Sequence, residues 1–124
     1  MNINLFFEKL TGQSIEESTA DLKEFVKKHL TPKSKNETMW VEGAQDLFVG
    51  GVLLLLEQKT KPTVEALQHL FAFDEITDTR RDIIVKNFKK ASKNIITYVS
   101  SYLSTPEGTF SCYVTILQTF LNRL

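Results

Sequence analysis

The stretch Met39–Gln58, MWVEGAQDLFVGGVLLLLEQ, constrains the fold of this chain more than any other. Its apolar residues recur with the i, i+3/i+4, i+7 spacing of one helical face. That face comprises Trp40, Ala44, Leu47, Phe48, Gly51, Leu54 and Leu55. Val52, Leu53 and Leu56 lie off this face, so the second half of the helix is apolar nearly all round. The stretch therefore predicts the central helix of a small all-α domain, surrounded by other helices.

Small residues in this stretch allow close packing. Ala44 and Gly51 lie on the apolar face, where a neighbouring backbone can approach. Gly50 and Gly51 together lower the helix propensity by about 2 kcal/mol relative to alanine, so packing has to offset them. The longest apolar run, Leu47–Leu56, is about half of the roughly 20 residues that span a membrane. We therefore expect a helix buried in a protein core.

Length and composition indicate one ordinary domain. The chain has 124 residues, with 15 Lys+Arg balancing 15 Asp+Glu, so net charge points to neither nucleic acid nor membrane. Its single cysteine, Cys112, forms no intrachain disulfide and suits a reducing cytosol. The first ten residues lack the basic and long apolar regions of a signal peptide. Three prolines, five glycines and no strongly alternating stretch argue against a sheet.

The first third of the chain predicts a lead-in to the core. Residues 2–11 indicate a short helix or docking segment. Ser14 is placed to cap a helix over Ile15–Leu30, and sparse apolar positions suggest that this helix lies on the surface. A polar, proline-containing linker follows it. We accordingly divide the chain into residues 1–35, with one or two short amphipathic helices, and a core over residues 36–124.

Three further helices are predicted after the central one. Thr63 reads as the N-cap of a short helix over Val64–Phe71, and an acidic bend follows over Phe73–Asp78. Thr79–Ser104 predicts a second long helix with one continuous apolar stripe. The stripe comprises Ile84, Phe88, Ala91, Ile95, Tyr98, Val99 and Tyr102. Proline after a hydroxyl residue predicts the last helix, Pro106–Arg123.

No residue pattern in the chain points to catalysis. His29 and His69 lack metal-ligand spacing, so a metal site that includes Cys112 is the weaker interpretation. Cys112 itself reads as a packing residue, since no base near it in the sequence suggests a nucleophile. Glu42 and Asp46 are four residues apart on the central helix, but solvated helix faces often carry such carboxylate pairs. A small helical enzyme is therefore the class with the least support.

Two lysine clusters are the candidate contact surfaces. The first lysine cluster consists of Lys27, Lys28, Lys33 and Lys35. The second lysine cluster consists of Lys86, Lys89, Lys90 and Lys93, which share the helical side opposite the apolar stripe. Each is either a solvated face or a contact surface for phosphates or an acidic protein. Trp40 is interpreted as a core anchor, with base stacking as the alternative.

Two ordered patterns carry a resemblance to a known family. The first is Met39-Trp40-x3-Ala44-x2-Leu47-x2-Gly50-x5-Leu56-Glu57. The second is Tyr102-Leu103-Ser104-x-Pro106-Glu107-x-Thr109-x-Ser111-x2-Val114-x-Ile116-Leu117-x2-Phe120. Together they resemble the all-α domain of type IV secretion coupling proteins, the TraG/TraD-like conjugative ATPases, over residues 36–124. In these patterns Trp40 matches the anchor, Ala44 close packing, and Glu107 and Thr109 the start of a helix.

The resemblance implies a function in conjugation. In that family the all-α domain is inserted in a nucleotide-binding domain of a membrane-anchored, hexameric ATPase that passes the relaxase–DNA complex to the secretion channel. The domain lies on the cytoplasmic face and is implicated in substrate recognition. The family's phosphate loop and Mg-binding motif lie outside this domain, and this sequence contains neither. The isolated domain is therefore expected to have no catalytic residue, cofactor or metal, while ATP and Mg²⁺ belong to the parent protein.

The expected partners are relaxosome proteins, either the relaxase or its accessory factor, with DNA as a further candidate. They would contact the two lysine clusters, and the isolated domain would be a monomer without direct membrane contact. The alternative is a stand-alone helical adaptor or DNA-binding regulator. A helix-turn-helix fits that alternative poorly, because the helix predicted over Thr79–Ser104 is too long and the preceding join is acidic.

Overall fold

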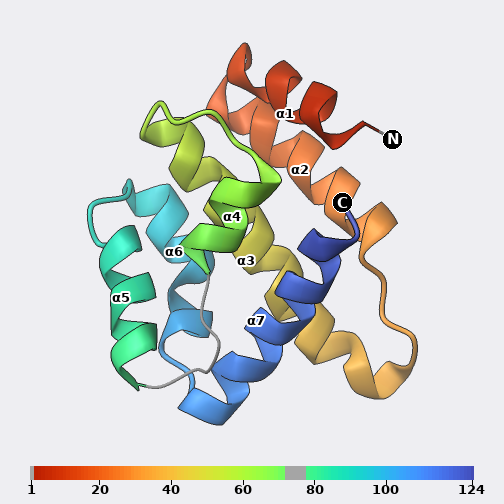
Figure 1. Ribbon diagram of the computed structural model, residues 1–124, viewed down its shortest axis with the longest axis vertical. Helices are drawn as coiled ribbons and strands as arrows, with labels where there is room; N and C mark the ends of the chain where they lie inside the picture. The colour runs from red at the N-terminus through yellow and green to blue at the C-terminus, as the bar shows by residue number, and fades with distance from the viewer. Residues whose placement is uncertain (1, 72–77) are drawn as a thin grey trace.

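The computed structural model describes residues 2–71 and 78–124, and within these ranges it contains seven α-helices, one 3₁₀ turn and no strand (Figure 1). The elements are α1 (Ile3–Thr11), α2 (Ile15–His29), η1 (Lys35–Glu37), α3 (Thr38–Glu57), α4 (Val64–Leu70), α5 (Asp78–Phe88), α6 (Lys93–Leu103) and α7 (Glu107–Asn122). The prediction of a compact all-α domain is confirmed.

Helix α3 is the centre of the fold, as its sequence predicts. It packs against α2, α6 and α7 (Figure 1), and every residue from Leu47 to Leu55 is buried. By length and composition alone, η1 and α3 together would be long and apolar enough to cross a membrane. Here two-thirds of that apolar stretch is buried inside the domain itself (67%).

Three glycines of α3 lie directly against bulky side chains: Gly43 against Tyr113, Gly50 against Val99, and Gly51 against Phe71. A Cβ added at Gly51 would lie 2.8 Å from a ring carbon of Phe71, and one added at Gly50 would lie 2.2 Å from Val99 Cγ1. Both distances are shorter than a real Cβ contact. The expectation of close packing at Gly51 is confirmed, and the structure extends it to Gly43 and Gly50.

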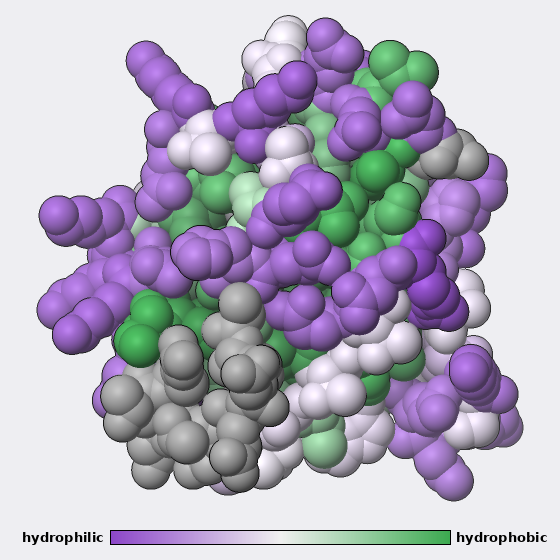
Figure 2. Space-filling model, viewed as in Figure 1, coloured by the Kyte–Doolittle hydropathy of each residue, from purple (hydrophilic) through white to green (hydrophobic). Residues whose placement is uncertain are grey.

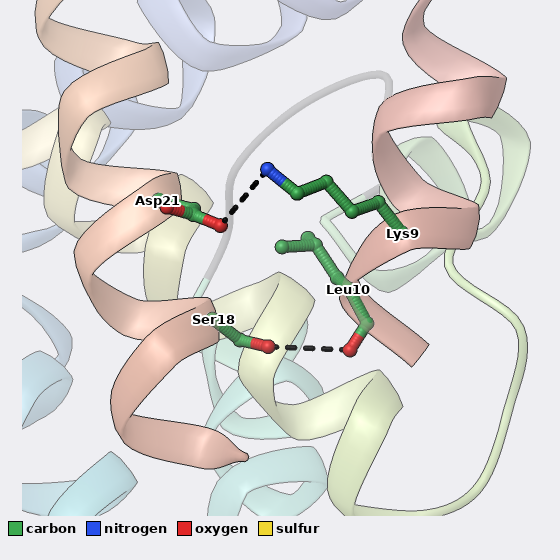
Figure 3. A network of polar contacts seen from close by, with 4 residues as sticks. All are labelled: Lys9, Leu10, Ser18 and Asp21. Atoms are coloured by element: carbon green, nitrogen blue, oxygen red, sulfur yellow. Dashed lines mark hydrogen bonds and ion pairs between the residues drawn. The ribbon is translucent and has the colours of Figure 1, made fainter. Parts of the chain in front are cut away.

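Helix α1 is fixed to α2 by two polar contacts (Figure 3). The hydroxyl of Ser18, itself buried, donates to the backbone oxygen of Leu10 at 3.2 Å. The Lys9 amine lies 3.6 Å from a carboxylate oxygen of Asp21. Residues 2–11 therefore form a short helix that is also docked on its neighbour, so both interpretations of this segment from the sequence apply.

Helix α2 begins as predicted but is more deeply packed than predicted. The Ser14 hydroxyl accepts the backbone N–H of Glu17 at 3.2 Å and so caps the helix. Leu22, Phe25 and Val26 are buried in the same core as α3. The expectation of a mere surface helix is wrong, because these three apolar residues fall on the side that faces α3, although Ile15 in the first turn is exposed.

The predicted single helix over Thr79–Ser104 is wrong, since the chain turns back between α5 and α6. Ser92 has extended backbone angles, and its N–H donates to both carboxylate oxygens of Glu57, at 2.9 and 3.1 Å. The carboxylate thus satisfies the backbone N–H of the N-cap residue of α6, and its negative charge complements the positive end of the helix dipole. A straight helix over that range would be about 39 Å long against about 30 Å for α3, so the turn lets both halves pack.

The remaining helix boundaries agree with the sequence to within one residue. The Thr63 hydroxyl accepts the N–H of Ala66 at 2.9 Å and caps α4. Pro106 has an extended ψ of 154° and precedes the first residue of α7. The predicted acidic bend over Phe73–Asp78 lies outside the described residues, apart from Asp78, where α5 begins.

Candidate functional site

The first lysine cluster lies where α2 gives way to the linker. Lys27 and Lys28 are in the last turn of α2, where cations complement the negative end of the helix dipole. Lys33 and Lys35 follow in the linker and η1, and all four residues are exposed. None of the four amines forms an ion pair with a residue that the structure describes. Their charge is therefore available to solvent or to a partner.

A small cavity of about 280 Å³ adjoins this cluster. Its lining includes Lys33, Glu37 and Arg123. The Glu37 carboxylate accepts the backbone N–H of Lys33 at 2.9 Å, so a negative charge sits inside the cavity. This mixed charge makes the cavity a poor receptor for a phosphate, although the lysines outside it remain accessible.

The second lysine cluster lies at the corner between α5 and α6. Lys86 is in the last turn of α5, Lys89 and Lys90 are in the connecting turn, and Lys93 opens α6. The prediction that they share one helix face is wrong, because the helix is interrupted there. They still gather at one corner, all are exposed, and in the described part of the chain none forms an ion pair. Long hydrophilic side chains extend from this edge in Figure 2.

The two clusters lie on opposite sides of the domain. In Figure 1 the linker after α2 is at the right, and the α5–α6 turn is at the left, with α3 between them. A single small partner therefore cannot cover both clusters at once. The structure makes them two separate candidate surfaces that can be altered independently.

A carboxylate–tyrosine cluster joins α3 to α6, and the sequence analysis missed it. The Tyr102 hydroxyl donates to the Asp46 carboxylate. Burial raises the pKa of the Tyr98 and Tyr102 hydroxyls well above the usual range, and the nearby charge of Asp46 and hydrogen bonding to it act in the same direction. The Lys23 amine lies 5.1 Å from the centre of the Tyr98 ring. The i, i+4 spacing of Tyr98 and Tyr102 indicates that the two side chains share one face of α6. The sequence does not show that Asp46 on α3 lies opposite that face.

This cluster changes the interpretation of the carboxylates on α3. Asp46 is half-buried and holds a tyrosine hydroxyl, whereas Glu42 is exposed one turn earlier. The two are therefore not an equivalent pair of solvated carboxylates. Asp46 acts chemically as a hydrogen-bond acceptor that connects two helices.

The remaining candidate ligands and nucleophile lie apart. His29 at the end of α2 and His69 in α4 are both exposed. Cys112 is exposed on α7, so its interpretation as a packing residue is wrong. Among the described residues, no group of three or more His, Cys, Asp or Glu side chains is arranged to hold a metal ion.

The residues assigned to structure lie in α3 and α7. Trp40 is only half-buried, with its ring centre 5.5 Å from that of Tyr113, so it anchors the edge of the core rather than its centre. Ala44 is completely buried. Glu107 begins α7, and Thr109 is half-buried in its first turn.

Comparison of the chain with protein-family profiles, curated proteins and solved structures finds no match. The function therefore has to be argued from the residues and their arrangement.

Proposed function

We propose that this chain is the substrate-recognition, all-α domain of a conjugative type IV secretion coupling protein. In this proposal it docks relaxosome proteins, the relaxase or its accessory factor, on the cytoplasmic side of the membrane. DNA is a second candidate ligand. ATP and Mg²⁺ would be bound by the nucleotide-binding domain of a hexameric parent protein, while this domain alone would be monomeric and without catalytic activity.

The observation that supports this proposal most is the place of the two resembling patterns in the fold. The first pattern forms α3, and the second forms the end of α6 and most of α7. Helices α3 and α7 make the most extensive helix–helix contact of the described structure. Patterns that are 45 residues apart in sequence, from Glu57 to Tyr102, thus belong to one packing unit. One packing unit is what the resemblance implies for two patterns of the same domain.

The lysine clusters supply the contact surface in this proposal. All eight lysines lie outside the α3–α7 contact and are exposed, so a partner can reach them without rearranging the core. The second lysine cluster is the stronger candidate, because its charges concentrate at one short turn. The first is spread over the end of α2 and the linker.

The geometry gives the DNA-binding regulator less support. The objection that the second helix is too long no longer holds, since α5 has only 11 residues. However, the seven positions 71–77 separate α4 from α5, more than the three or four of a helix-turn-helix. Helices α5 and α6 have a four-residue join, but α6 packs on both α3 and α5, so fewer than half of its 11 residues are exposed for contact with a DNA groove.

The test is to measure binding to purified relaxase, to its accessory protein, and to labelled single- and double-stranded DNA over a range of salt concentrations. Two variants are compared with the unmodified chain. One has glutamate at all four positions of the second lysine cluster, and the other has glutamate at all four positions of the first. They carry the same change in charge on opposite sides, so each is the control for the other.

Saturable binding to the relaxase or accessory protein, lost in the second-cluster variant and retained in the first-cluster variant, would support the proposal. Absence of binding to either protein at low salt would contradict it. Direct DNA binding through four lysines should weaken with a log–log salt slope of roughly −3 to −4 for duplex DNA. Absence of DNA binding at low salt would remove DNA from the proposed ligands, and DNA binding with a much shallower slope would show that the four lysines do not make the contact.

A further inference from the structure

Helix α5 exposes more apolar surface than its packing uses. Of its three consecutive β-branched residues, Ile84 is buried, but Ile83 and Val85 on either side are 46% and 37% exposed. The helix packs chiefly on α6. Figure 2 shows a hydrophobic spot over this helix, next to hydrophilic side chains. Isolated exposed apolar residues are common, so the shape and charge around them decide whether they form a site.

Val85 lines a groove of about 600 Å³ between α5 and α6. Phe88, Ile96 and Leu103 also line it. Phe88 is almost fully buried, while Ile96 and Leu103 are half-buried. From Ile96 to Leu103 the groove follows about 10 Å of α6, or two helical turns. Its apolar surface is thus long enough for two side chains on one face of a short helix.

Charge divides this groove into two unlike ends. Lys86 and Lys89 line it at the α5–α6 turn, and the other two residues of the second lysine cluster lie beside them in the chain. The opposite end is lined by Asp82, Ser100 and Ser104. Neither lysine amine is paired within the described residues. A ligand should therefore be apolar along its length and acidic only at the end near the turn.

We propose that this groove binds an amphipathic helix with an acidic first turn, contributed by a relaxosome protein. This inference rests on the proposed function and specifies the partner chemistry of the second lysine cluster. Two apolar side chains at i and i+3/i+4 enter the groove, and the acidic first turn lies against Lys86 and Lys89. Acidic residues at a helix N-terminus also stabilise the ligand's own helix. A DNA backbone presents phosphates but no apolar row, so it leaves the groove floor unoccupied.

The direct test titrates the isotopically labelled chain with a synthetic helix of about 15 residues and follows backbone NMR shifts. The peptide has leucines at i, i+3/i+4 spacing on one face and glutamates in its first turn. A second peptide has lysines in place of the glutamates. We expect saturable shifts in α5, α6 and their turn with the acidic peptide, and at least tenfold weaker binding of the basic one. Equal binding of both peptides, or no saturable shift with either, would overturn the proposal.

Two matched substitutions locate the site on α5. Val85→Asp places a charge in the groove, whereas Ile83→Asp places the same charge on the other side of the helix, where Ile83 lines a different cavity. Both side chains are already partly exposed, so both variants should fold, as the dispersion of their NMR spectra will show. Val85→Asp should weaken the acidic peptide at least tenfold and Ile83→Asp less than twofold. Equal effects of the two would overturn the groove assignment.

The electrostatic part is tested by Lys86→Glu combined with Lys89→Glu, which should weaken the acidic peptide about tenfold and strengthen the basic one. The same variants are then tested with the relaxase and accessory protein. If these proteins bind and Val85→Asp has no effect on them, the groove inference fails while the proposed function stands. If the peptide binds the groove but neither relaxosome protein binds the chain, the proposed function fails and the groove's preference for acidic helices remains.

Discussion

Helices α3 and α5 show two opposite uses of apolar residues. In α3 every residue from Leu47 to Leu55 is buried, and three glycines bring neighbouring side chains onto its backbone. In α5 Ile84 is buried while the adjacent Ile83 and Val85 are exposed, and one neighbour, α6, provides most of its packing. The apolar residues of α3 thus stabilise the fold, whereas two of the apolar residues of α5 remain exposed to solvent.

This difference separates the part of the chain that specifies the structure from the part that is free to contact a partner. Changes in α3 should alter stability first and binding only through unfolding. Changes at the α5–α6 corner should alter binding with little effect on stability. The following substitutions test this division, from the largest expected effect to the smallest.

Phe48→Ala should have the largest effect on stability. Phe48 is completely buried on α3, and its ring packs against those of Phe25 and Phe120 at 6.0 and 5.5 Å between centres. Removing it should lower the free energy of unfolding by about 3–5 kcal/mol. Ile83→Ala on α5, by comparison, should change it by about 0.5 kcal/mol or less. Urea unfolding measures both, and similar losses would contradict the division between the helices.

Trp40→Ala should have an intermediate effect. The ring is half-buried at the edge of the α3–α7 contact and packs on Tyr113. We therefore expect a loss of about 1–3 kcal/mol, less than for a fully buried aromatic side chain. The same variant tests base stacking. A drop in single-stranded DNA affinity with an unchanged thermal midpoint would assign Trp40 to a contact surface instead of the core edge.

Gly50→Ala tests the close approach of α3 and α6. The added methyl group would collide with Val99, which should lower the free energy of unfolding by about 1–3 kcal/mol, while the gain in helix propensity returns about 1 kcal/mol. Gly108→Ala in α7 is the control, because no atom lies within 4 Å of its added Cβ. That control should be neutral or stabilising. If Gly50→Ala is as well tolerated as Gly108→Ala, the two helices are not in the close contact described here.

Tyr102→Phe should have a smaller effect at neutral pH and a distinct pH dependence. Loss of the hydrogen bond to Asp46 from a half-buried hydroxyl should lower the free energy of unfolding by about 1 kcal/mol. The folded-state pKa of Tyr98 and Tyr102 is raised above that of unfolded tyrosine, about 10. The stabilisation is therefore complete below pH 10 and is lost as pH rises above it.

The alkaline part of this prediction is measured by urea unfolding between about pH 9 and 11. The unmodified chain should lose more stability over this interval than a variant with phenylalanine at both Tyr98 and Tyr102. The absorbance of tyrosinate should also appear at a higher pH in the folded chain than in the chain unfolded in urea. An equal alkaline loss in both proteins would show that the tyrosines do not contribute in this way.

The sequence predicted the core well, because helical periodicity records which side of a helix is buried. It identified most of the buried face of α3, although not Val41 or Val49, and the buried residues Ile84, Phe88, Ile95 and Val99. It did not predict the turn between α5 and α6, since the apolar spacing continues unbroken through it. The turn depends on Glu57, which accepts the N–H of Ser92 from 35 residues away. Such a long-range contact leaves no local signal.

The candidate sites show the same limit. The lysines could be found by charge alone, but not their separation onto opposite sides of the domain, which depends on how α2 and α6 pack around α3. The groove was also hidden, because Val85 and Leu103 come together only when the chain folds back at Lys89–Ser92. Asp46 and Tyr102 likewise meet through packing, 56 residues apart.

The most direct test of the central division is native-state hydrogen exchange of the chain, alone and with the purified relaxase or accessory protein. In the free chain, the amides of α3 and α7 should exchange only through global unfolding, and those of α5 much faster. Addition of the partner should slow exchange in α5, the α5–α6 turn and the first turn of α6, and leave the linker after α2 unchanged. Exchange in α5 as slow as in α3, or partner protection confined to the linker, would contradict this account.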